Sequence, residues 1–151
     1  MRILAAALAC VVGSLAGHAM AAGTAEGGSP AMDSDRSCLA RGIYQEARGE
    51  PVAGMVAVGY VAKNRTGGVR TACDVLTERK AGGRCEFSWA CARLPAIREQ
   101  EAWQRSLAVA EAVLAGGVPD PSGGATYFNT CDEAIRDWGG RYAMTARIGG
   151  H

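Results

Sequence analysis

The sequence predicts a single α+β domain, mainly helical with a small β element. Three long segments, at about 34–48, 51–65 and 97–115, have the apolar periodicity or composition of helices. A multiple turn at 119–124 precedes an alternating segment at 125–129 that is typical of a short strand. The segment that remains after an export signal has the size of one domain with a single core.

The N-terminus has the pattern of an export signal. Arg2 supplies a positive charge, residues 3–12 form a short apolar core, and Ala19-Met20-Ala21 is a small-residue cleavage site. Cleavage after Ala21 leaves 130 residues. We therefore expect a signal peptide at 1–21, a flexible leader at 22–33, a domain at 34–151, and export to the periplasm or the extracellular space.

Each helix has local start and stop signals. Ser34 or Asp35 can cap the first helix, and Gly49 with the restriction before Pro51 ends it. Pro51 can open the second helix, which is uncharged from 52 to 62 and is predicted to be the central buried one.

The second half of the chain alternates helices with irregular segments. A short helix is predicted at 71–78, and the Gly- and Cys-rich segment 81–92 is predicted to be a hairpin or an irregular loop. The helix at 97–115 is amphipathic, with Trp103 on its apolar face, and Gly116-Gly117 ends it. The interpretation of 138–148 stays open.

Charge and histidine content exclude several kinds of function. Without Arg2, 15 basic residues balance 15 acidic ones, so no nucleic-acid partner and no capture by an anionic membrane is expected. His18 leaves with the signal, and His151 is then the only imidazole. Zinc amidases and peptidases normally need two or more imidazole ligands, and Cys or Ser nucleophiles normally need a neighbouring His base. A terminal residue is a poor candidate for either role. We expect no metal, no cofactor and a monomer.

Cysteines are dense for an exported chain of this size, which predicts disulfides. Cys85 and Cys91 are near enough to close a small loop, which leaves Cys38 and Cys73 to pair by elimination. Cys131 is then left over, and the sequence assigns it no role.

Glu46 is the leading catalytic candidate. At about 100° per residue it falls on one helical stripe with Leu39 and Ile43, so it interrupts an apolar face. A desolvated carboxyl group favours its protonated form and can donate a proton near neutral pH. The structural alternative is a buried Glu paired with Arg48 or with backbone donors.

Four ordered blocks resemble the cell wall hydrolase family that includes the spore cortex-lytic enzymes. They are C-L-A-x-x-I-Y-x-E-A-R-G-E-P from Cys38, C-E-F-S-W-A-C from Cys85, P-D-P-S-G-G-A-T-Y-F-N from Pro119 and R-I-G-G-H from Arg147. The resemblance implies a lysozyme-like fold and cleavage of peptidoglycan glycan strands, in some members as lytic transglycosylases. It also implies that Glu46, the first Glu of its block, is the catalytic acid and base.

The resemblance also places the second and third blocks near the substrate. Phe87, Ser88, Trp89, Tyr127 and Asn129 are then candidate sugar contacts, and core packing is the alternative for each aromatic ring. Glu50 is a possible second carboxylate if the first helix persists, although a structural role at the start of the second helix is preferred. Asp120 is predicted to form a turn.

Other functions remain as alternatives to a lytic transglycosylase. They are a hydrolytic muramidase, a peptidoglycan amidase or peptidase, and an inactive glycan-binding module. The single mature histidine disfavours the amidase, and a binding module has no need of an acid on an apolar stripe.

Overall fold

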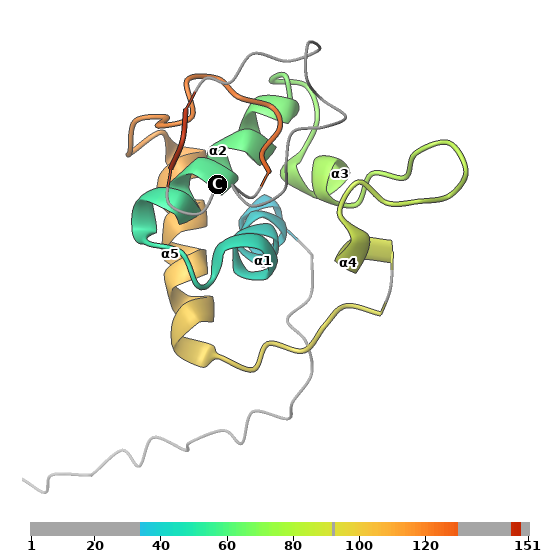
Figure 1. Ribbon diagram of the computed structural model, residues 1–151, viewed down its shortest axis with the longest axis horizontal. Helices are drawn as coiled ribbons and strands as arrows, with labels where there is room; N and C mark the ends of the chain where they lie inside the picture. Colours follow the sequence, from blue (N-terminus) through green and yellow to red (C-terminus); the bar gives the residue numbers. More distant parts are fainter. Residues whose placement is uncertain (1–33, 92, 130–145, 149–151) are drawn as a thin grey trace, which may run out of the picture.

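The computed structural model describes residues 34–91, 93–129 and 146–148 (Figure 1). Within them α1 contacts α2, α3 and α5, and Figure 1 shows it at the centre of this group. The helices of the described residues are α1 Asp35–Ala47, α2 Val52–Arg65, α3 Ala72–Leu76, α4 Ser88–Cys91 and α5 Gln100–Ala115. The predicted order and approximate bounds of the longer helices are confirmed.

Local capping explains where α1 begins. The Ser34 hydroxyl accepts from the Ser37 backbone N–H at 3.2 Å, and the Ser37 hydroxyl lies 3.1 Å from the Ser34 backbone N–H. This reciprocal pair satisfies two donors that a helix start leaves unpaired. The Asp35 carboxylate accepts from the Ala72 backbone N–H at 3.0 Å, so the starts of α1 and α3 are held together.

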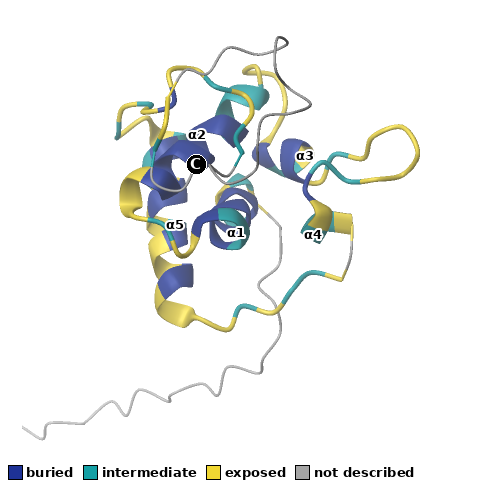
Figure 2. Cartoon of the chain, in the orientation of Figure 1, coloured by how far each residue is buried: buried dark blue, intermediate teal, exposed yellow. Residues whose placement is uncertain are grey.

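The core lies around α1 and α2. Residues 38–44 of α1 and 54–62 of α2 are all buried, and Figure 2 shows both helices as the darkest part of the domain. A Cβ atom added at Gly59 would lie 3.1 Å from Ile43 Cδ1 and 3.3 Å from Val113 Cγ2. The missing side chain therefore lets α2 pack closely on α1 and α5. The predicted central position of the second helix is shared with α1.

The segment before α5 is fixed from α1 rather than by helical structure. The Tyr44 hydroxyl accepts from the backbone N–H groups of Arg98 and Glu99, each at 3.2 Å. The buried Arg41 guanidinium donates to the Pro95 carbonyl oxygen at 2.7 Å. The amphipathic helix begins at Gln100, whereas the sequence predicted a start at residue 97.

The predicted β element is not confirmed. Residues 125–129 form no strand, and within the described residues the β pairing is one isolated bridge between Arg79 and Cys85. A strand needs a partner, and the Ala125 carbonyl oxygen instead accepts from the Asn64 side-chain amide at 3.1 Å. The predicted hairpin or loop at 81–92 is partly right, because it contains one end of that bridge, Cys85, but residues 88–91 form α4.

Several predictions concern residues outside the described part of the chain. These are the signal peptide at 1–21, the leader at 22–33, Cys131 and His151, together with most of the segment 138–148. Among the residues that are described, none of the helices combines the length and the apolar character that crossing a membrane requires.

Candidate active site

Glu46 lies in the last turn of α1. Leu39 and Ile43, which share its helical stripe, are fully buried, whereas Glu46 is partly buried. The helix ends at Ala47, one residue later. The carboxyl group is therefore carried by the last turn of a helix that is packed in the core.

The indole of Trp89 is the hydrogen-bond partner of Glu46. Trp89 Nε1 donates to Glu46 Oε1 at 2.7 Å. The bond joins the end of α1 to α4 across 43 positions of sequence. Of the two structural alternatives, the pairing of Glu46 with Arg48 is not what the described residues show, because Arg48 forms its ion pair with Glu99 at 2.9 Å.

A disulfide closes the short segment that carries Trp89. Cys85 and Cys91 are bonded, with their Cα atoms 5.4 Å apart, and the Cys85 end joins the bridge to Arg79. The predicted Cys85–Cys91 pair is therefore present in the structure. The second predicted pair, Cys38–Cys73, is also present and links α1 to α3. We call residues 85–91 the disulfide loop.

Arg65, at the end of α2, holds the disulfide loop from the other side. Its Nη1 lies 3.0 Å from Glu86 Oε1, and both side chains are largely buried. Its guanidinium lies 5.6 Å from the centre of the Phe87 ring and 5.3 Å from that of Tyr127. Cation–π contacts of this kind orient rings as well as attract them.

The charge of Glu86 follows from these neighbours. Burial raises the pKa of its carboxyl group. The hydrogen bond from Lys80 and the nearby Arg65 guanidinium together lower the pKa by more than burial raises it. The net pKa lies below the usual value, so Glu86 is ionised at neutral pH and keeps the ion pair with Arg65.

The turn that leads to Tyr127 is organised by Asp120. One carboxylate oxygen accepts from the Ser122 backbone N–H at 2.8 Å, and the other accepts from Gly124 N–H and from the Asn64 side chain, each at 3.0 Å. Burial raises the pKa of Asp120, but these hydrogen bonds outweigh it, and the net pKa is lowered. Asp120 is thus a turn-forming residue, as the sequence predicted, and Asn64 holds the turn on α2.

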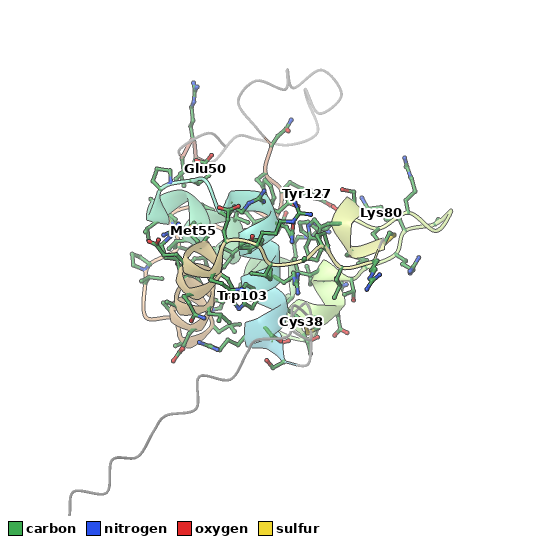
Figure 3. All side chains as sticks on the ribbon, turned by 90° about the horizontal axis from the view of Figure 1, so that it is seen from below. Cys38, Glu50, Met55, Lys80, Trp103 and Tyr127 are labelled. Atoms are coloured by element: carbon green, nitrogen blue, oxygen red, sulfur yellow. A yellow bond between two sulfur atoms is a disulfide. The ribbon has the colours of Figure 1, made fainter. Side chains whose placement is uncertain are left out.

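The candidate sugar contacts have different surroundings. Tyr127 is 39% exposed and Ser88 is exposed, so both are accessible, and Asn129 is partly buried. Figure 3 shows Tyr127 toward the end of the domain opposite Cys38, which lies near the start of α1. Phe87 is only 7% exposed and packs 5.9 Å from the Trp89 ring, so the core alternative describes it better.

Glu50 does not share a helical face with Glu46. Since α1 ends at Ala47, the condition on which Glu50 could act as a second carboxylate from that helix is not met. The Glu50 backbone N–H donates to the Ala47 carbonyl oxygen at 3.0 Å, and its side chain lies against Gly54 in the first turn of α2. This position agrees with the preferred structural role.

The sequence placed Trp89 with the candidate sugar contacts and not with Glu46, and it did not include Arg65 among the site residues. A Trp between two nearby cysteines is a weak signal, since nothing in the spacing indicates which distant side chain its N–H will reach.

For a metal centre, the described segments contain no cluster of three or more His, Cys, Asp or Glu side chains placed to bind an ion.

The chain is similar to known proteins over most of its length. Residues 49–151 match the profile of a family described as Cell Wall Hydrolase. The spore cortex-lytic enzyme of Halalkalibacterium halodurans is 34% identical over 124 residues, which cover 79% of this chain and 34% of that enzyme. The chain thus spans about a third of the length of the curated relative that it matches. No solved structure matches.

Proposed function

Because the chain belongs to the cell wall hydrolase family, we propose that it cleaves peptidoglycan glycan strands between N-acetylmuramic acid and N-acetylglucosamine, with Glu46 as acid and base. The observation that carries the proposal is the Glu46 carboxyl group, held at 2.7 Å by the Trp89 indole at the end of a packed helix. A positioned carboxyl group within reach of a glycosidic oxygen is what general acid catalysis requires.

The first step is the donation of a proton. Protonated Glu46 transfers its proton to the glycosidic oxygen while the bond from that oxygen to C1 of muramic acid breaks. Positive charge develops on the sugar ring as an oxocarbenium-like centre, and N-acetylglucosamine leaves with a free hydroxyl group. Glu46 is then a carboxylate.

The second step returns the proton. The Glu46 carboxylate removes the proton of the C6 hydroxyl group of muramic acid, and that oxygen bonds to C1 to close a 1,6-anhydro ring. No water is consumed, so a single carboxylate is sufficient. The position of Glu50, beyond the end of α1, is compatible with a mechanism that uses one carboxylate.

Sugar binding is proposed for accessible side chains of the disulfide loop and of the segment that follows the Asp120 turn. The Tyr127 ring is exposed and stacked with Arg65, so it offers a flat surface for a sugar ring. Ser88 and Asn129 offer polar groups for hydroxyl or acetamido groups. Phe87 contributes indirectly, by packing under the disulfide loop.

Replacement of Glu46 by Gln tests the proposal. The variant keeps the shape of the side chain but has no transferable proton, so we expect cleavage of purified sacculi to fall by at least ~10²-fold. The release of soluble glycan measures activity, and circular dichroism confirms that the variant is folded. Activity within a few-fold of the parent would contradict the role of Glu46.

The products separate the alternative reactions. Mass spectrometry of the released fragments should find 1,6-anhydromuramic ends, which are lighter by one water than the reducing ends formed by a hydrolytic muramidase. An amidase or peptidase would release stem peptides from intact glycan strands, and a binding module would release nothing.

A further inference from the structure

We propose that Trp89 is a positioning residue for Glu46, and that the disulfide loop is the scaffold that presents its indole to the carboxyl group. The proposal rests on the function proposed for Glu46. It adds a group that touches the catalytic carboxyl and a structural reason for the Cys85–Cys91 bond.

The chemistry of an indole suits this position. Its N–H is a donor only, so it cannot take the proton that Glu46 must deliver and recover. A protonated carboxyl group has one carbonyl oxygen and one hydroxyl oxygen, and a donor at 2.7 Å from Oε1 makes Oε1 the carbonyl. The transferable proton is thereby assigned to Oε2.

The same contact persists after the proton has left. When Glu46 is a carboxylate, the indole N–H donates a charge-assisted hydrogen bond to Oε1, which leaves Oε2 to accept the next proton. Trp89 thus holds the carboxyl plane in one orientation through both steps. Such preorganisation matters because a small displacement of a catalytic group lowers the rate severely.

Three anchors hold the indole in place. The segment Ser88–Cys91 is a single helical turn, which is too short to be stable by itself. The disulfide joins its end to Cys85, and Glu86 is paired with Arg65 at 3.0 Å. Phe87 is buried in the core with its ring beside that of Trp89. The backbone on both sides of Trp89 is therefore restrained.

The alternative is that Trp89 contributes only apolar packing. Trp89→Phe distinguishes the two roles, because it keeps an aromatic ring in the loop and removes the N–H group. If positioning is the role, cleavage of sacculi should slow by about 10- to 100-fold, the loss expected for one hydrogen bond to a charged group. Sedimentation with sacculi should show binding within a few-fold of the parent.

Trp103→Phe is the matched control. Trp103 is 6% exposed and packs edge-on against Tyr44 with ring centres 6.1 Å apart, so the change has the same chemistry in the core. It should leave the cleavage rate of the folded protein near that of the parent. Equal losses in both variants would assign the effect of Trp89→Phe to packing and overturn the proposal.

A second variant tests the scaffold. Cys85→Ala with Cys91→Ala releases one end of the loop while Trp89 and Glu46 are both retained. We expect a loss of cleavage in the same direction as that of Trp89→Phe, in a protein that is still folded by circular dichroism. A parental rate in this variant would contradict the scaffold.

A spectroscopic measurement reports the contact independently of activity. The chain has three Trp residues, so a ¹H–¹⁵N spectrum contains three indole N–H signals, and Trp89→Phe identifies one of them. Glu46→Ala should move that signal and leave the Trp103 signal in place. If none of the three indole signals moves in Glu46→Ala, the proposal is overturned even when Trp89→Phe does not fold.

The failure of this proposal differs from the failure of the proposed function. If Glu46→Gln is inactive while Trp89→Phe retains the parental rate, the function stands and the positioning role is wrong. If Glu46→Gln remains active, the function of Glu46 falls and the positioning role falls with it, although the indole signal still reports whether the two side chains touch.

Discussion

The two disulfides of this domain do different things. Cys38–Cys73 joins α1 to α3 across 35 positions of sequence, and Cys38 is fully buried in the core. Cys85–Cys91 spans 6 positions, and Cys91 is exposed. The first lies among packed helices near the start of α1, whereas the second encloses the segment whose Trp89 contacts the other end of that helix.

The disulfide that contributes more to the free energy of unfolding is not the one that restrains the segment carrying Trp89. In the chain-entropy account, a crosslink that closes a longer loop removes more conformations from the unfolded chain, so the free energies gained are about 4 kcal/mol for the first bond and about 2 kcal/mol for the second. The second bond nevertheless restrains a helical turn that cannot hold itself. We infer that the larger stabilisation belongs to the bond that is farther from Glu46.

The largest expected effect on stability therefore comes from the core bond. Cys38→Ala with Cys73→Ala should lower the free energy of unfolding by about 4 kcal/mol, against about 2 kcal/mol or less for Cys85→Ala with Cys91→Ala. Urea unfolding followed by circular dichroism measures both. A larger loss of stability on removal of the Cys85–Cys91 bond would contradict this ranking of the two disulfides.

The Asp120 turn adds a third case, because it is held on α2 by hydrogen bonds and not by a covalent bond. Asp120→Ala removes the two carboxylate oxygens that accept hydrogen bonds from Ser122, Gly124 and Asn64. Each of these donors then loses a hydrogen-bond partner. We expect a loss of about 1–3 kcal/mol in the free energy of unfolding.

An exposed ion pair provides the control for this change. Glu101 is 91% exposed and pairs with Arg105 one helical turn away at 2.8 Å. Glu101→Ala should change the free energy of unfolding by no more than about 0.5 kcal/mol. If Asp120→Ala had an effect as small as this control, the hydrogen bonds of the turn would not be what stabilises it.

The effect expected at the disulfide loop is a pH dependence of stability. The pKa of Glu86 is lowered in the folded protein from its usual value of 4.5. A carboxyl group with a lowered folded pKa stabilises the fold above its unfolded pKa, and this contribution is lost as the pH falls through the folded pKa. Stability should therefore decline below about pH 4.5.

Glu86→Gln isolates this contribution. Gln does not titrate, so the variant should be less stable than the parent at neutral pH, and the difference should shrink on acidification. Urea unfolding at about pH 7 and about pH 3 measures it. A difference that is the same at both pH values would mean that the charge of Glu86 does not contribute. Asp120 and Asp74, whose pKa values are also lowered, titrate in both proteins and contribute to the remaining slope.

The sequence determined the long helices because their signals are local. Ser34 caps α1, the residue before Pro51 is restricted, and Gly116 adopts the left-handed conformation that ends α5, with φ of +68°. Each signal acts on neighbours within about one helical turn. The same locality explains the error at 97–99, because the contacts that hold this segment come from Tyr44 and Arg41 of α1, 54 or 55 positions away.

The disulfide pairs were predictable in part. Cys85 and Cys91 are separated by so few residues that a bond between them requires only a tight loop, and the Cys38–Cys73 pair followed by elimination. Residues 125–129 were not predictable in the same way. Alternation is a property of the segment, but a strand requires a partner, and the structure binds this segment to Asn64 instead.

For the site, residue spacing was enough to predict that a carboxyl group, Glu46, interrupts an apolar helical stripe, because side-chain direction on a helix follows from spacing alone. The group that this carboxyl contacts depends on the tertiary structure. The partner is the Trp89 indole, 43 positions away, and Arg65 supports it by binding Glu86 and covering Phe87. Contacts at such separations depend on how helices pack against one another, and the sequence pattern of neither partner encodes them.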